Sequence, residues 1–214
     1  MRVLLILILG LAHSAFAQQV ETPSGKLVGS ASEHADSISV FKGIPYALAP
    51  TGARRWTYAE AHPGWQGVRN ATRFSPGCIQ HPYPEGSFFA RSSDPTSEDC
   101  LYLNVWSPKS KTKPLPVMVW IHGGALTRGS GSTATYDGAE LAKKGVVLVT
   151  INYRLGMFGY LAHPELSAET EGNHSGNYGT SDQIQALRWV QANIAAFGGD
   201  PNSVTIFGES AGSW

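Results

Sequence analysis

Four short apolar runs in the second half of this 214-residue chain constrain its fold most. They cover residues 101–106, 117–122, 146–151 and 204–207, and they are rich in β-branched and aromatic residues. Continuous apolar runs of this length are typical of strands that are buried on both faces of a sheet. We therefore predict that they form the central strands of one sheet.

A helix is predicted between the last two runs, at residues 182–197. Five apolar residues recur there at spacings of three and four, which places them on one helix face: Ile184, Leu187, Val190, Ile194 and Phe197. Thr180 and Gln183 can form a capping box, and Gly198-Gly199 can end the helix. The strand–helix–strand order predicts a right-handed crossover between parallel neighbours, hence an α/β fold with a mostly parallel, doubly wound sheet.

The first half of the chain has a different character. Residues 19–46 alternate turn residues with short strand-like stretches, which predicts an N-terminal antiparallel meander that extends the same sheet. Residues 47–98 are dense in Pro, Gly, Ser and Arg, and we predict ordered loop there. No domain boundary is evident.

The first 17 residues are typical of a cleaved secretory signal peptide. Arg2 is followed by an apolar run over residues 3–11 and by the small-residue site Ala15-Phe16-Ala17, so the mature chain is expected to begin at Gln18. A transmembrane anchor is the alternative, but it requires about 20 apolar residues. We expect a secreted or periplasmic protein without a stable membrane anchor.

The charge balance excludes several classes of partner. The chain carries 16 Lys+Arg against 16 Asp+Glu and has no long basic run. It therefore lacks the positive patch expected for binding to nucleic acid or to an anionic membrane surface. Small neutral partners are expected instead.

Export bears on the two cysteines, Cys78 and Cys100. An oxidising compartment lets them persist as a disulfide, whereas two unpaired buried thiols would require a cytosolic setting. Sequons at Asn70 and Asn173 can carry glycans only if the host organism attaches them.

The pentapeptide Gly208-Glu209-Ser210-Ala211-Gly212 matches the pattern G-x-S-x-G. It follows the predicted strand at 204–207 and precedes residues that can begin a helix, which is the setting of a nucleophile elbow. The glycines leave room for a strained turn that exposes the serine hydroxyl. An ordinary tight turn with a solvent-facing serine is the alternative.

A second glycine-rich segment, His122-Gly123-Gly124-Ala125, directly follows the strand predicted at 117–121. Its backbone can turn N–H groups toward a substrate, as the oxyanion loops of esterases do. The alternative is a flexible glycine loop, and that is how we interpret the adjacent Gly129-Ser130-Gly131-Ser132.

Six sequence blocks, in order, carry a resemblance to a known family. They are FKGIPYA (41–47), EDCLYLNVWSP (98–108), WIHGGAL (120–126), NYRLG (152–156), GNYGTSDQ (176–183) and FGGDPNSVTIFGESAGSW (197–214). With them the chain resembles the type-B carboxylesterase/lipase family, which includes bacterial para-nitrobenzyl esterases, mammalian carboxylesterases and cholinesterases.

The resemblance implies an α/β-hydrolase fold, hydrolysis of small neutral carboxylic esters, and no metal or cofactor. It assigns Ser210 as the acyl nucleophile and Glu209 as a neighbouring carboxylate that tunes the site without serving as the catalytic acid. The oxyanion donors would be the N–H groups of Gly124, Ala125 and Ala211. The resemblance also implies a disulfide Cys78–Cys100 and the ion pairs Arg154–Asp182 and Arg55–Glu98.

Members of that family are much longer, and the acid and the histidine of their triad follow the nucleophile. The resemblance therefore implies that residues 18–214 are the N-terminal part of a catalytic domain, that both groups lie beyond residue 214, and that this segment alone is inactive. Non-catalytic relatives that have lost the nucleophile, and amidases of the same fold, are alternatives. Ser210 with both oxyanion segments favours an esterase.

Overall fold

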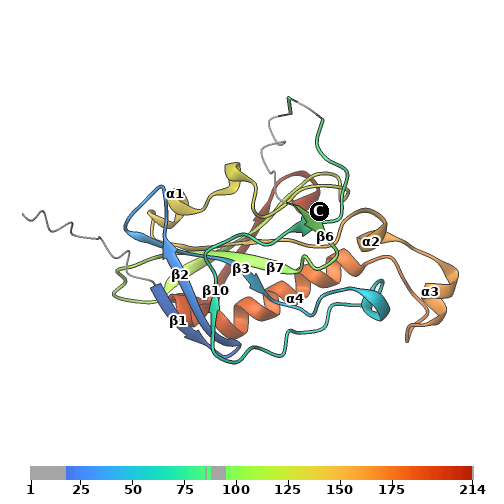
Figure 1. Ribbon diagram of the computed structural model, residues 1–214, viewed down its shortest axis with the longest axis horizontal. Helices are drawn as coiled ribbons and strands as arrows, with labels where there is room; N and C mark the ends of the chain where they lie inside the picture. Colours follow the sequence, from blue (N-terminus) through green and yellow to red (C-terminus); the bar gives the residue numbers. More distant parts are fainter. Residues whose placement is uncertain (1–17, 85, 88–94, 214) are drawn as a thin grey trace, which may run out of the picture.

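The computed structural model describes residues 18–84, 86–87 and 95–213 (Figure 1). The predicted signal peptide at residues 1–17 lies outside the described residues. Within them, none of the helices combines the length and the apolar character needed to cross a bilayer.

One mixed sheet organises the fold. Its strands are β1 (Gln18–Thr22), β2 (Gly25–Ala31), β3 (Ile38–Pro45), β7 (Tyr102–Pro108), β8 (Leu115–Ile121), β9 (Val147–Ile151) and β10 (Gly199–Gly208), in the spatial order β1-β2-β3-β7-β9-β8-β10. A short strand, β4 (Val68–Asn70), pairs with β2, and β5 (Gly77–Cys78) pairs with β6 (Thr96–Ser97) in a separate two-stranded sheet. The four predicted central strands are confirmed as β7, β8, β9 and β10.

The two halves of the sheet differ in strand direction. The N-terminal strands β1, β2 and β3 form the predicted antiparallel meander, which continues antiparallel through β7 to β9. Strands β8, β9 and β10 are parallel, with β8 between the other two. The predicted direct pairing of the strands at 146–151 and 204–207 is therefore wrong, because the crossover from β9 to β10 passes over β8.

Helices cover both faces of the sheet, as predicted, with α1 (Ala139–Ala142) on one face and α4 (Tyr178–Asn193) on the other (Figure 1). The strand residues alternate accordingly. In β9, Val147, Val149 and Ile151 join the core cluster that contains Trp189 and Val190 of α4. Leu148 joins the second cluster, which contains Ala139 and Ala142 of α1. Two further short helices, α2 (Gly156–Tyr160) and α3 (Pro164–Ala168), lie between β9 and α4.

The predicted helix at 182–197 exists but is placed differently. It begins at Tyr178, and its N-cap is Asn177, which makes no side-chain cap bond, so the predicted capping box at Thr180 and Gln183 is wrong. A 3-10 turn over Ile194–Phe197 follows and ends at Gly198, whose φ of 80° is the left-handed conformation expected of a glycine stop.

The buried face of α4 also differs from the apolar face read from the sequence. Val190, Ile194 and Phe197 are buried, but Ile184 is 47% exposed. Asp182 is fully buried instead, and it lies almost opposite Ile184 around the helix. An inward-facing carboxylate therefore sets the rotation of this helix.

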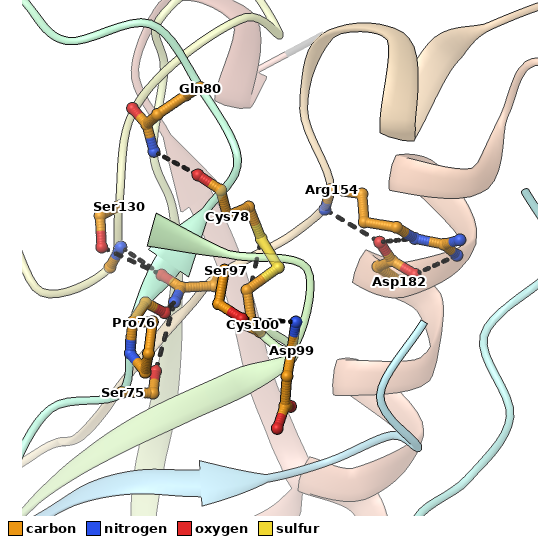
Figure 2. The surroundings of a disulfide bond; sticks show 12 residues. Ser75, Pro76, Cys78, Gln80, Ser97, Asp99, Cys100, Ser130, Arg154 and Asp182 are labelled. Carbon is orange, nitrogen blue, oxygen red and sulfur yellow. Dashed lines mark hydrogen bonds and ion pairs between the residues drawn. A yellow bond between two sulfur atoms is a disulfide. The ribbon is translucent and has the colours of Figure 1, made fainter. Parts of the chain in front are cut away.

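Arg154, just after β9, is the partner of Asp182 (Figure 2). Its Nε and Nη2 donate to the two carboxylate oxygens at 2.8 and 2.7 Å, and its backbone N–H donates at 2.9 Å. Both side chains are buried. The predicted ion pair Arg154–Asp182 is confirmed, and it ties the carboxyl end of β9 to α4.

We predict that Asp182→Ala lowers the free energy of unfolding by about 3–5 kcal/mol, because it leaves a buried guanidinium without its counter-charge. Urea denaturation of the purified protein measures the change. Glu169→Ala, at an exposed carboxylate, is the matched control and should stay near the wild-type value. Equal losses in the two variants would contradict a structural role for the pair.

Candidate active site

Ser210 lies where strand β10 turns into a short 3-10 helix, η4 (Ser210–Ser213). Its φ is +52°, a left-handed conformation that non-glycine residues adopt rarely and that concentrates at functional sites. Ser210 is exposed, and within the described residues its hydroxyl has no hydrogen-bond partner. This strand–turn–helix context is the one predicted from the pentapeptide.

The two glycines that flank the turn allow a close approach to the neighbouring strand. A Cβ on Gly212 would overlap the carbonyl oxygen of Ile121, the last residue of β8. A Cβ on Gly208 would overlap the Gly212 carbonyl and would lie 2.7 Å from the same Ile121 oxygen. Only residues without a side chain therefore let the turn pack against the end of β8.

This packing brings the segment after β8 against Ser210. A Cβ on Gly123 would lie 3.0 Å from Cβ of Ser210 and would overlap the carboxylate of Glu209. Gly124, Ala125 and Leu126 follow with positive φ values of 103°, 56° and 61°. The two glycine-rich segments predicted to act together are neighbours in space.

Three backbone donors remain available at this junction. The N–H groups of Gly124, Ala125 and Ala211 donate no hydrogen bond to any residue that the structure describes. Ala211 is only 5% exposed, and a backbone N–H in such a position normally has a partner. A ligand oxygen that enters the site can supply the missing acceptor.

A cavity of about 390 Å³ opens beside Ser210, Gly124 and Ala125. Its lining residues are Tyr83, Gly124, Ala125, Thr127, Arg128, Tyr136, Glu209 and Ser210. The Arg128 guanidinium lies over the Tyr83 ring, 5.4 Å from its centroid. Thr127, Arg128 and Tyr136 were not predicted at this site, because single residues between strands carry no periodic signal. In the described part of the chain no cluster of three or more metal-binding side chains is found.

His122 lies beneath the loop and not in the cavity lining. It is 1% exposed, its ring stacks on Tyr153 with centroids 4.5 Å apart, and its Nδ1 lies 2.8 Å from the Gly123 oxygen. Burial lowers the pKa of the imidazole to about 4, so the ring is neutral at pH 7. A neutral, enclosed ring is suited to shaping the loop.

The interpretation of Gly129-Ser130-Gly131-Ser132 as a flexible loop is wrong. Gly129, Ser130 and Gly131 are buried, and the Gly131 N–H donates to Asn152 Oδ1 at 2.8 Å. Gln80 accepts from the Gly129 N–H at 2.7 Å and donates to its carbonyl at 2.8 Å. These buried bonds hold the segment in place despite its glycines.

The predicted disulfide between Cys78 and Cys100 is confirmed (Figure 2). Both cysteines are buried, and neither is a free thiol. The predicted pair Arg55–Glu98 is also confirmed, with two hydrogen bonds of 2.6 and 2.7 Å that hold the pKa of Glu98 below its usual value. The sequon residues Asn70 and Asn173 are exposed, and their glycosylation stays a prediction.

The sequence of this chain matches one protein-family model and several known esterases. The model described as the Carboxylesterase family matches residues 17–214. Fumonisin B1 esterase of Sphingopyxis macrogoltabida is 48% identical over 210 residues, which cover 95% of this chain and 38% of that protein. Para-nitrobenzyl esterase of Bacillus subtilis (strain 168) is 47% identical over 196 residues, which cover 91% of this chain and 38% of that protein.

Solved structures agree with these sequence matches. A PNB esterase superposes with a TM-score of 0.79 at 45% identity, covering 92% of this chain and 38% of that one. A Geobacillus stearothermophilus carboxylesterase superposes with a TM-score of 0.78 at 50% identity, covering 91% and 38%. The chain thus spans a little over a third of the length of these relatives.

The turn geometry predicts that Gly212→Ala lowers the free energy of unfolding by about 1–3 kcal/mol, because its methyl group would overlap backbone at the end of β8. Gly77→Ala is the matched control, since the added Cβ would meet its nearest neighbour at an ordinary 3.5 Å. Urea denaturation compares the two. Equal stabilities would show that the elbow tolerates a side chain.

The buried His122 predicts a dependence of stability on pH. Its pKa is about 4 in the folded protein against 6.5 for a free imidazole, so the unfolded chain binds a proton first as the pH falls. The stability that this group contributes is complete above pH 6.5 and decreases by roughly 3 kcal/mol as the pH falls to 4.

Unfolding free energies of the wild type and of His122→Asn, measured from pH 7 to pH 4, test this expectation. The variant should lose less stability over that interval than the wild type. His81→Asn, at an exposed histidine, should follow the wild-type curve. If the unfolding free energies of all three proteins changed with pH in parallel, the lowered pKa of His122 would be contradicted.

Proposed function

The chain belongs to the carboxylesterase family and has part of the α/β-hydrolase fold of the solved PNB esterases, and on this premise we propose that it hydrolyses carboxylic esters with Ser210 as the nucleophile. The observation that carries the proposal is the strained Ser210 turn at a cavity that Gly124 and Ala125 also line, with the N–H groups of Gly124, Ala125 and Ala211 unpaired among the described residues. A purely structural turn would not require a serine in a left-handed conformation.

In the proposed reaction the Ser210 oxygen attacks the ester carbonyl carbon, and a histidine takes the hydroxyl proton. The carbonyl electron pair moves onto the oxygen, which becomes negative. The N–H groups of Gly124, Ala125 and Ala211 would donate to that oxygen, and each such donor typically accelerates catalysis by about 10²–10³-fold. Proton return from the histidine releases the alcohol, and water then hydrolyses the acyl-serine to free the acid.

The proposal expects the acid and the histidine of the triad in sequence beyond residue 214. In G-x-S-x-G hydrolases of this fold both groups follow the serine along the chain. Two observations on the described residues support this expectation: no histidine is among the residues that line the cavity with Ser210, and the ring of His122 is buried against the Gly123 carbonyl. Residues 18–214 would then form the N-terminal part of the catalytic domain.

Glu209 has a separate proposed role. Its carboxylate packs against Gly123 and also lines the cavity, next to Ser210 in the chain. A negative charge at this point favours a positively charged histidine during the reaction. We therefore propose that Glu209 tunes the electrostatics of the site and is not the acid of the triad.

The proposed substrates are small neutral carboxylic esters, and the proposed location is secreted or periplasmic. The family supports ester substrates, while the cavity size supports a small acyl or alcohol group. The disulfide and the signal-like first residues support an oxidising compartment outside the cytosol.

We predict that Ser210→Ala, in the protein expressed from its complete coding sequence, lowers kcat/KM for short-chain 4-nitrophenyl esters by at least about 10⁴-fold, because the attacking oxygen is removed. Release of 4-nitrophenolate measures the rate. Ser203→Ala, at an exposed serine of the same strand β10, is the control and should retain wild-type activity. Unchanged turnover in Ser210→Ala would contradict the assignment of Ser210 as the nucleophile.

A further inference from the structure

Two successive peptide carbonyls after β8 are held from the buried side of the loop. The Tyr153 hydroxyl donates to the His122 carbonyl at 2.7 Å. The Nδ1 atom of His122 lies 2.8 Å from the Gly123 carbonyl. A carbonyl oxygen can only accept, so Nδ1 carries the ring proton and donates it. In the described chain Nε2 of the same ring has no partner, so the polar contact of this imidazole is made through Nδ1.

The hydrogen bond to Gly123 fixes more than one carbonyl. The Gly123 C=O and the Gly124 N–H belong to the same planar trans peptide unit, in which they point in opposite directions. With the carbonyl turned toward the buried imidazole, the Gly124 N–H is turned away from it. Gly124 and Ser210 both line the cavity.

The imidazole is itself held on two sides. Its ring stacks on Tyr153 at an interplanar angle of 20°. Gly129 packs so closely that an added Cβ would overlap Nδ1 and would lie 2.7 Å from the Gly123 oxygen. Gln80 holds Gly129 through both its N–H and its carbonyl. The Gln80 amide also donates to the carbonyl of Cys78 at 3.0 Å, which connects this contact to the disulfide (Figure 2).

We propose that His122 is a positioning residue: through Nδ1–H it holds the Gly123–Gly124 peptide so that the Gly124 N–H faces the reacting carbonyl oxygen, and Gln80 keeps Gly129 packed against its ring. This inference rests on the proposed function, in which Gly124 is an oxyanion donor. It assigns a task to a buried polar side chain that touches no substrate.

Two substitutions at one position separate this role from simple packing. The side-chain amide of Asn can place an N–H close to the position of Nδ1, whereas Leu fills similar space without a donor. We expect His122→Leu to lower kcat for 4-nitrophenyl esters by about 30–100-fold, somewhat less than the loss of a whole donor, with KM changed by less than about threefold. His122→Asn should recover at least about tenfold of that loss.

The affinity of an inhibitor that forms a tetrahedral adduct with Ser210 measures the contribution of the Gly124 N–H directly. The Ser210 oxygen adds to the carbonyl carbon of an alkyl trifluoromethyl ketone, its proton passes to the histidine of the triad, and the ketone oxygen becomes the oxyanion. The inhibition constant should rise in parallel with the loss of kcat/KM in each variant, because both depend on the same donor. A substitution that weakened only ground-state binding of the ester would raise KM without this proportionality.

Gln80→Leu tests the support of the ring at a distance. It should lower kcat and raise the inhibition constant of the trifluoromethyl ketone together. Its effect should be non-additive with that of His122→Leu, since both substitutions act through the Gly123–Gly124 peptide. Gln191→Leu is the matched control, because Gln191 makes one exposed side-chain bond to the Pro201 carbonyl on another part of the chain. The control should retain wild-type kcat.

Equal activities of His122→Leu and His122→Asn would overturn the proposal, as would a loss confined to KM or an unchanged inhibition constant. If His122→Leu fails to fold, Gln80→Leu and His122→Asn decide the question by the same two measurements. Failure of the proposed function is recognised separately, because hydrolysis would then survive Ser210→Ala. The positioning role alone fails if Ser210→Ala abolishes hydrolysis while His122→Leu leaves kcat unchanged.

Discussion

The close backbone packing between the turn after β10 and the end of β8 is the constraint on which the rest of the site depends. Parallel pairing sets Gly208 opposite Ile121, so both strands end at the same edge of the sheet. Gly208 and Gly212 then let the two backbones approach to a distance that any side chain would prevent. Ser210 and the segment from His122 to Ala125 become neighbours for this reason, although they are far apart in sequence.

Residues from distant parts of the sequence support the strand ends and the loop at this edge of the sheet. Arg154 and Asp182 join the end of β9 to α4 through buried, charge-assisted hydrogen bonds. Gln80 donates to the carbonyl of the disulfide-bonded Cys78 and to that of Gly129, and Gly129 packs on the ring of His122. These polar contacts surround a loop whose own glycines would otherwise leave its conformation open, so the available N–H groups are presented by a supported backbone.

Prediction from the sequence succeeded where one physical rule dominates. Apolar runs located β7, β8, β9 and β10, and glycine spacing located the turn at Ser210. It failed where contacts between distant residues compete with the local pattern. Ile184 fits an apolar helix face but is exposed, because the Arg154–Asp182 pair sets the rotation of α4. Gly129 and Gly131 suggested mobility, but partners from residues 80 and 152 hold them.

The sequence by itself determined the central strands β7 to β10 and the turn that exposes Ser210, because these follow from local composition and from motif spacing. The family resemblance, which six sequence blocks carry, implied the disulfide Cys78–Cys100. The tertiary structure alone decided that β8 lies between β9 and β10, that Arg128 and Tyr136 face the same cavity as Ser210, and that His122 holds the Gly123 carbonyl. The physical reason is that these features depend on which distant backbones approach each other, and hydrophobic periodicity carries no information about that approach.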